Sequence, residues 1–392
     1  MHIPPYHKLD PQQQAFLDKI SKSISNPDSK FHNQWIQGFA GSGKSVLLAY
    51  TAKIILQKKP QARILVIVFT RSLKEMFKAD FNELGLGTMI TIDTYYRFMS
   101  RSERYDYILC DEVQDLTPRV LNEIRDRCSN VIVAGDSNQS IFERDPRWKE
   151  TTVCPSAIGE LINGSPYELG VIHRLSQSII DAIQCFSPQM NIFTSKIDMT
   201  KENTQIRLCE ATSEEKEVEY IMEQATKAIN IGDTAAILTP KAKIIEFTNQ
   251  VLRSAGKPEW EVLINKQGNP NFEAMNQHLL MNGIPIQYLG NGYGCFNENN
   301  RLINIMTFHS AKGLDFENVF IPFANKSLYI NLSESIAKTL FMVAMTRTRK
   351  NLYITYTGAP IEILNTFESK CLRIDIPTAQ STPAVENNSW GF

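Results

Sequence analysis

The chain has 392 residues, a formal net charge of -1 and seven cysteines. This length predicts two or three domains, each large enough to bury its own core. The charge excludes a protein that is basic overall, so any contact with nucleic acid has to come from a local groove. An odd number of cysteines without paired metal-type spacing argues against a disulfide framework or a zinc site and predicts reduced thiols in the cytoplasm. No segment approaches the length of a membrane span, so we expect no membrane partner.

The first motif lies between an expected strand and an expected helix. Residues 35–37 are strand-like, and residues 46–56 have the apolar content of a buried helix. The segment between them fits G-x-x-x-x-G-K-[ST], in which backbone N–H groups surround phosphate oxygens. A lone match could be an ordinary turn before a helix, but the strand, loop and helix order is the context that the motif requires. The predicted nucleotide-binding residues are Gly38, Phe39, Ala40, Gly41, Ser42, Gly43, Lys44 and Ser45.

The second motif is an apolar strand that ends in two carboxylates. Residues 107–110 are expected to form this strand, and Asp111 and Glu112 follow it directly. Such a strand would deliver Asp111 to a metal ion, together with the Ser45 hydroxyl, and Glu112 to an attacking water. Lys44 would meet the β and γ phosphate charges. The two motifs together therefore predict nucleotide hydrolysis.

Strands rich in Ile and Val alternate with amphipathic helices, which predicts an α/β fold with parallel sheets covered on both faces. The clearest expected strands of a first unit are residues 64–69, 107–110 and 131–134. Those of a second unit are residues 235–238, 303–306, 318–321 and 352–355. The second unit has no phosphate loop of its own. The polar tail, residues 375–392, has little to bury and is expected to be disordered.

Six motifs in order resemble those of UvrD-type superfamily 1 helicases, from about Leu9 to Thr357. Beside the phosphate loop, the family's glutamine motif, D-E-x-Q-D box and G-D-x-x-Q-S-I-[YF] segment are similar to residues 9–13, 111–115 and 135–142. Its T-x-H-x-x-K-G-L-[ED]-[FW] and V-A-x-T-R motifs are similar to residues 307–316 and 343–349. The resemblance implies two RecA-like P-loop NTPase domains, with ATP and Mg²⁺ in the cleft between them. We expect the N-terminal ATP-binding domain at residues 1–166 and the C-terminal helicase domain at residues 167–374.

The same resemblance assigns roles around the nucleotide. The catalytic residues would be Lys44, Glu112, Gln139 as a reporter of the γ-phosphate, Arg174 as a second cation and Arg347 as the arginine finger. Gln13 and His173 would contact the base and Asp315 the ribose, Gly313 would also belong to the nucleotide-binding residues, and Ser45 and Asp111 would bind the metal. For the two arginines the plain alternative is a surface position, and for Asp315 it is a solvated loop acid.

Nucleic-acid contacts would combine phosphate-binding groups with aromatic platforms that stack on any base. By resemblance these contacts fall on Phe69, Thr70, Arg71, Thr91, Tyr95, Phe142, Thr307 and His309. Exposed stacking and core packing look alike in a sequence, so Phe69 and Tyr95 could equally belong to a core.

Several positions depart from the family pattern. His173 stands where the family has a base-stacking Tyr, and Asp93 replaces a common His, which would put a negative charge where a phosphate might pass. Glu143 to Asp145 replace an expected Arg and Trp after Phe142. The accessory insertions of longer relatives are absent or reduced. Residues 255–276 form an insertion-like loop that suits either a partner contact or a plain surface loop.

The resemblance implies an ATP-dependent DNA helicase or single-strand translocase of UvrD type, with movement 3′ to 5′ on single-stranded or partly duplex DNA as the direction expected of that family. The alternative is a nucleic-acid-stimulated ATPase that acts as a sensor or regulatory subunit for a nuclease or another partner in DNA repair or anti-phage defence. A binding protein with a dead ATP site is disfavoured because every catalytic residue named above is present.

Overall fold

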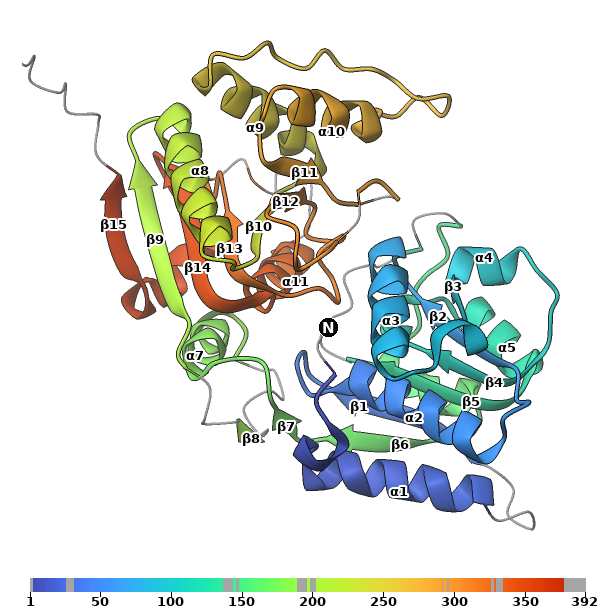
Figure 1. Ribbon diagram of the computed structural model, residues 1–392. Helices are drawn as coiled ribbons and strands as arrows, with labels where there is room; N and C mark the ends of the chain where they lie inside the picture. The colour runs from blue at the N-terminus through green and yellow to red at the C-terminus, as the bar shows by residue number, and fades with distance from the viewer. Residues whose placement is uncertain are drawn as a thin grey trace, which may run out of the picture.

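The computed structural model describes residues 3–25, 32–136, 144–145, 148–188, 196–197, 202–290, 292–294, 296–325, 328 and 334–376. Gln139, Phe142 and the tail from residue 377 lie outside these ranges. The described residues form two α/β units, each built around one parallel sheet (Figure 1). Within them, no helix has both the length and the apolar character needed to cross a membrane.

The sheet of the first unit has the strand order β3-β2-β4-β5-β1-β6, and every pairing is parallel. Its strands are β1 (Asn33–Gly38), β2 (Ile64–Val68), β3 (Thr91–Thr94), β4 (Tyr105–Cys110), β5 (Cys128–Gly135) and β6 (Gly164–Leu169). The helices α1 (Pro11–Ser25), α2 (Lys44–Lys58) and α3 (Arg71–Glu83) contribute to one apolar core. The helices α4 (Tyr95–Met99), α5 (Pro118–Asp126) and α6 (Ile158–Leu161) contribute to another. The sheet is therefore covered on both faces, as the apolar central strands require.

The sheet of the second unit has the order β11-β12-β10-β13-β14-β9-β15, again with parallel pairings. Its strands are β9 (Gln205–Ala211), β10 (Ala235–Leu238), β11 (Ile286–Tyr288), β12 (Ile303–Met306), β13 (Phe316–Ile321), β14 (Thr348–Thr357) and β15 (Leu372–Ile376). Its helices are α7 (Gln177–Phe186), α8 (Glu214–Asn230), α9 (Lys241–Ser254), α10 (Phe272–Met281), α11 (Glu334–Met345) and α12 (Glu362–Phe367). A short parallel pair, β7 (Val171–Ile172) and β8 (Lys196–Ile197), follows β6. The expected α/β fold with parallel sheets is confirmed.

The expected boundary between the two units, at residue 166, falls within strand β6. Strand β6 pairs with β1 as far as Leu169, past the expected boundary at residue 166. Helix α7 already packs on α11 and α12 of the second unit. We therefore propose that the first domain ends after Leu169.

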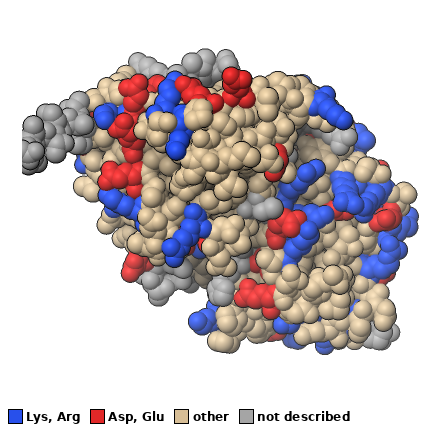
Figure 2. All heavy atoms as spheres, turned by 45° about the horizontal axis from the view of Figure 1, so that its top comes forward, with Lys and Arg blue, Asp and Glu red and all other residues tan. Residues whose placement is uncertain are grey.

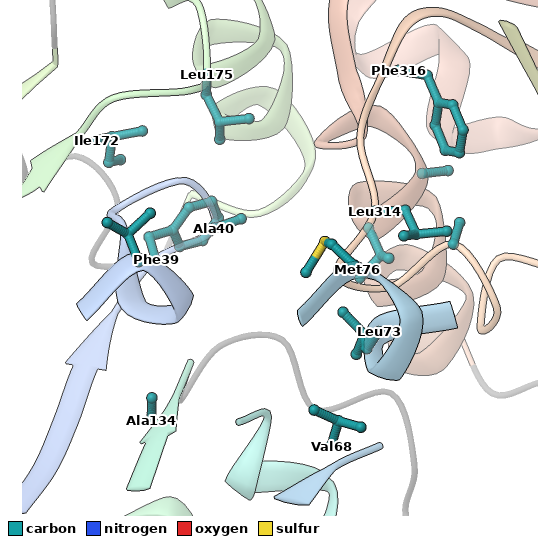
Figure 3. Close-up of a cluster of buried hydrophobic side chains, with 14 of the residues drawn as sticks. Phe39, Ala40, Val68, Leu73, Met76, Ala134, Ile172, Leu175, Leu314 and Phe316 are labelled. Carbon is teal, nitrogen blue, oxygen red and sulfur yellow. The ribbon is translucent and has the colours of Figure 1, made fainter. Parts of the chain in front are cut away.

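Apolar contacts join the two units at two places (Figure 3). Leu73 and Met76 of α3 lie beside Leu314, which belongs to the loop before β13, and a Cβ added to Gly313 would collide with Leu73. At the other place, Phe39 and Ala40 of the phosphate loop lie beneath Ile172 and Leu175. These contacts hold polar groups of the second unit against the phosphate loop.

Candidate nucleotide-hydrolysis site

The phosphate loop follows the carboxyl end of β1 and leads into the N-terminus of α2. Gly41 and Gly43 have φ angles of 82° and 89°, a region that only glycine enters without strain. Gly41 also has no room for a side chain, because an added Cβ would lie 2.5 Å from Cβ of Arg174. The N-terminus of a helix after such a loop presents unpaired backbone N–H groups and favours anions. The predicted loop therefore has the geometry of a phosphate site.

Lys44 places its ammonium group at the entrance of this loop. Its Nζ donates to the carbonyl oxygens of Gly38 at 2.9 Å and Phe39 at 3.0 Å. The side chain is largely buried, so its charge is weakly screened by solvent. An ammonium at this position suits the negative charge of a bound phosphate.

The two expected metal ligands meet at the first turn of α2. Ser45 Oγ donates to Asp111 Oδ2 at 2.6 Å, and burial together with the neighbouring Glu112 raises the pKa of Asp111. A hydroxyl and a carboxylate fit Mg²⁺, which prefers oxygen ligands and takes few of them from the protein when waters and phosphates complete its shell. In the part of the chain that the structure describes, no three His, Cys, Asp or Glu side chains form a denser metal cluster.

Glu112 occupies a constrained position directly after β4. Its φ of 54° is left-handed, which is uncommon for a residue with a side chain. Its Oε2 accepts from Gln114 Nε2 at 2.6 Å and lies 3.5 Å from Lys312 Nζ. Burial alone would raise the pKa of Glu112, but Lys312 and Lys44 outweigh it and hold that pKa well below its usual range. The carboxylate is thus ionised, as a general base must be.

The contact with Lys312 links the two units. Lys312 is 2% exposed and forms an ion pair with the fully buried Asp115, which lies in the first unit. Burial would lower the pKa of Lys312, but Asp115 and Glu112 raise it above that of an ordinary lysine. Sequence reasoning did not select Lys312, Asp115 or Gln114 as site residues, although all three stand inside the quoted motifs. Only the tertiary structure brings these motifs together.

The two predicted arginines are both held at the interface, which excludes the plain surface alternative. Arg347 donates from Nε to Val343 O at 3.0 Å and from Nη1 to Leu314 O at 3.2 Å. Burial and the nearby Arg174 lower the pKa of Arg347 to about 9. Arg174 packs on Gly41, as described above. The backbone and Cβ of Arg174 therefore lie against the phosphate loop, whereas the guanidinium of Arg347 is held by groups of the second unit.

Asp315 is not a solvated loop acid. It accepts two hydrogen bonds from Arg349, from Nε at 2.9 Å and from Nη2 at 2.8 Å, and lies 3.8 Å from Arg174 Nη1. Burial would raise the pKa of Asp315, but Arg174 and Arg349 lower it. The carboxylate is therefore held by Arg349 and lies within ion-pair distance of Arg174, and its expected contact with the ribose stays a prediction.

The predicted base-contacting residues, Gln13 and His173, both lie on the phosphate loop. Gln13 Nε2 donates to Ser42 O at 3.0 Å, and the backbone N–H of His173 donates to Gly41 O at 3.0 Å. The two side chains are joined through Asp10, whose Oδ2 lies 2.6 Å from His173 Nε2.

The aromatic residues expected to contact nucleic acid differ in exposure. Tyr95 is fully buried, and its hydroxyl donates to Asp145 at 2.8 Å. Phe69 is partly exposed and stacks on Tyr95 with ring centroids 5.0 Å apart. This corrects the expectation that Tyr95 contacts nucleic acid, because its ring is part of the buried core. Phe69 packs against that ring from the more exposed side. Trp148 packs edge-on against the same ring at 6.0 Å.

Asp93 also turns inward, which corrects the expectation of a negative charge on the strand path. It pairs with Lys74 at 2.8 Å, Arg101 at 3.2 Å and Arg97 at 3.5 Å. The cluster therefore carries a net positive charge. Figure 2 shows Lys and Arg side chains gathered on the surface of the first unit, toward the right of the view. A local basic surface is what a contact with nucleic acid would require of a chain with almost no net charge.

The remaining expected strand contacts lie near the ends of strands. Thr70 caps α3 by accepting from Leu73 N at 3.2 Å, and Arg71 and Thr91 are exposed. Thr307 Oγ1 accepts from Ser310 N at 3.0 Å. Burial and Lys312 lower the pKa of His309 to about 4, so its imidazole is neutral at physiological pH.

Comparisons with known families agree with this geometry. The UvrD/REP helicase N-terminal domain matches residues 71–149, and the UvrD-like helicase C-terminal domain matches residues 260–359. Two segments of the chain are thus similar to the two domains of UvrD-like helicases. The model of the type III restriction enzyme res subunit also matches, at residues 6–96. The resemblance inferred from the motifs is confirmed.

Individual proteins that are similar to this chain match it only in part. A probable DNA helicase II homolog from Mycoplasma pneumoniae is 42% identical over 62 residues, which cover 14% of this chain and 9% of the relative. A solved structure titled "The structure of PRRSV helicase" has 14% identity and a TM-score of 0.45, with 94% of this chain and 58% of that chain covered. The chain therefore spans less than two thirds of the length of both.

Proposed function

We propose that this UvrD-like chain is an ATP-dependent helicase or single-strand translocase that moves 3′ to 5′ on single-stranded or partly duplex DNA. The observation that carries the proposal is the contact of Lys312, from the second unit, with Asp115 and Glu112 of the first. A change in the spacing of the units would move this cation relative to the catalytic carboxylate. Opening and closing of the cleft would thereby be coupled to hydrolysis.

The residues present support each step of phosphoryl transfer. The phosphate loop and Lys44 bind the phosphates, and Ser45 and Asp111 would hold Mg²⁺, which neutralises phosphate charge when bound. Glu112 accepts the proton of the attacking water. Arg174 and Arg347 stabilise charge on the γ-phosphate once the guanidinium groups turn toward it. Asp315 stays a proposed contact of the ribose, and Gly313 a proposed nucleotide-binding residue.

The sensor or regulatory role is the second candidate, and one observation favours it. The expected loop at residues 255–276 ends earlier than expected, because α10 begins at Phe272; in the segment between α9 and α10, Val262, Leu263 and Ile264 are 47%, 54% and 57% exposed. Ile264 forms a bridge with Pro270, so these side chains are displayed on an ordered turn. Adjacent exposed apolar side chains suit a protein partner such as a nuclease.

Steady-state ATP hydrolysis tests the proposal. The intact chain would be compared with Lys44→Ala and with Lys58→Ala, an exposed lysine at the other end of α2. Each would be assayed alone and with single-stranded DNA, duplex DNA or single-stranded RNA, at two salt concentrations. We expect salt-sensitive stimulation by single-stranded DNA in the intact chain and Lys58→Ala, and loss of hydrolysis in Lys44→Ala.

Movement separates the two candidate functions. A motor would displace a protein obstacle bound to the strand, or unwind a partly duplex substrate, only while ATP is hydrolysed. A sensor would hydrolyse ATP in response to the strand without doing either. If no DNA or RNA changed the rate of ATP hydrolysis, both the motor and the nucleic-acid-stimulated sensor would be contradicted.

A further inference from the structure

Gln114 lies in the short 3₁₀ helix Val113–Asp115, which directly follows Glu112. The residue is fully buried. Its Nε2 donates to Glu112 Oε2 at 2.6 Å, and its Oε1 accepts from the backbone N–H of Asp136 at 3.0 Å. One side-chain amide therefore joins the expected general base to the end of β5.

The end of β5 leaves space for this amide. Its last residue is Gly135, and a Cβ added there would lie 2.2 Å from Gln114 Oε1. Any other residue at position 135 would therefore displace the amide. Gly135 thus provides the space that the amide needs, and Asp136 provides the hydrogen-bond donor.

Glu112 depends on its surroundings to keep its conformation. Its left-handed backbone, with a φ of 54°, persists only where neighbouring contacts maintain it. Gln114 and Lys312 both approach the same carboxylate oxygen, Oε2, the first at 2.6 Å and the second at 3.5 Å. Gln114 belongs to the first unit, as Glu112 does, whereas Lys312 comes from the second. Only the contact with Gln114 would therefore persist if the two units moved apart.

The other carboxylate oxygen of Glu112, Oε1, accepts no hydrogen bond from the residues that the structure describes. In hydrolysis, one O–H bond of the water breaks as its oxygen bonds to the γ-phosphorus. The proton goes to the base, and the bond to the leaving oxygen breaks with its electron pair on ADP. A base acts efficiently only when it is held in reach of that proton. Oε1 is the oxygen of Glu112 that is available for it.

We propose that Gln114 is a positioning residue for ATP hydrolysis, which holds Oε2 of Glu112 and thereby directs Oε1 to the attacking water. The inference rests on the proposed role of Glu112 as the general base. Because the amide and the carboxylate belong to one unit, this positioning does not depend on nucleic acid. Removing the amide should therefore slow hydrolysis by the same factor with and without single-stranded DNA.

The test is the rate constant of ATP hydrolysis in a single turnover, together with the Kd of ATP. Gln114→Met has a similar volume but no amide, and should lower the rate constant by about 10- to 100-fold, the scale of a misplaced reacting group. The Kd of ATP should be unchanged, because the phosphate loop and the metal ligands are untouched. Gln114→Glu keeps an acceptor for Asp136 but no donor for Glu112, and should lose at least as much. Gln250→Met, at a buried glutamine of α9, is the control that should hydrolyse ATP normally.

A double-variant cycle separates positioning of the base from a general structural role. If Gln114 acts through Glu112, Gln114→Met should cause no further loss in the Glu112→Gln protein, because the base that it positions is absent. Losses that multiply would overturn the inference. Gly135→Ala displaces the amide without removing it, so it should repeat both results, and it replaces Gln114→Met if that variant does not fold.

The same measurements keep this inference distinct from the proposed function. Retained hydrolysis in Glu112→Gln would contradict the proposed base and the inference together. Lost hydrolysis in Glu112→Gln with normal hydrolysis in both Gln114 variants would contradict the inference alone. The expected cycle without unwinding or displacement of an obstacle would support the inference and contradict the motor. Absence of hydrolysis in the intact chain would contradict both.

Discussion

Two sets of residues were predicted from motifs: the nucleotide face around the phosphate loop, and the strand-contact surface that includes Tyr95. In the structure the first set lies together, whereas part of the second is buried. At the nucleotide face, Lys44, Ser45, Asp111 and Glu112 converge around one loop, and Arg174 packs on it. On the strand-contact surface, Tyr95 and Asp93 turn inward. A phosphate site depends on backbone geometry and charge, which the order of motifs specifies. A stacking platform depends on exposure, which neighbouring elements control.

The largest expected effect at the nucleotide face comes from removing the arginine finger. Arg347→Ala should lower kcat by about 10³-fold or more, because a finger acts on transition-state charge. Arg347→Lys should recover only a small part, since an ammonium cannot reproduce the guanidinium contacts. Single-turnover hydrolysis measures the loss, with Arg301→Ala, an exposed arginine, as control. Normal turnover in Arg347→Ala would make this residue structural.

Removing the general base should have the next effect. Glu112→Gln should lower kcat by about 10²- to 10⁴-fold while ATP still binds, because Asp111 and Ser45 are untouched. Rapid quench kinetics together with nucleotide binding measure the two properties separately. Retained turnover would assign the base to another group.

Breaking the buried ion pair between Lys312 and Asp115 should chiefly lower the free energy of unfolding. Lys312→Met leaves Asp115 buried without its cation, which should lower the free energy of unfolding by about 3–5 kcal/mol. The double variant Asp115→Asn with Lys312→Met should recover most of this loss and thereby identify the pair. The folded pKa of Lys312 is raised, so its contribution persists at neutral pH and is lost only as pH rises beyond the ordinary lysine range. Chemical denaturation at pH 7 measures both variants, and an unchanged stability in Lys312→Met would contradict this reading.

The smallest effects should distinguish the two stacked rings. Tyr95→Phe removes one buried hydrogen bond and should cost about 1–3 kcal/mol of stability, with the affinity for single-stranded DNA unchanged. Phe69→Ala should weaken that affinity by about 1–3 kcal/mol if the partly exposed ring stacks on a base. Fluorescence anisotropy with a labelled strand measures both. If Tyr95→Phe weakened the affinity for single-stranded DNA and left the stability unchanged, Tyr95 would contact the strand after all.

The central strands were predictable because they are continuous apolar runs. The expected strands at residues 235–238 and 303–306 coincide with β10 and β12. In contrast, β6 and β15 lie at sheet edges and carry exposed polar side chains, so they lack that signal. The expectation for residues 255–276 stays open between a partner contact and a surface loop, although Trp260 in that segment is buried.

By itself the sequence determined the phosphate loop, the acidic end of β4 and the alternation of strands and helices, because each depends on residues close together along the chain. Only the tertiary structure decided that Lys312 reaches Asp115 and Glu112, that Asp10 orients His173, and that Tyr95 is buried. These contacts join segments far apart in the sequence. Their geometry depends on how two packed units meet, which local patterns do not encode.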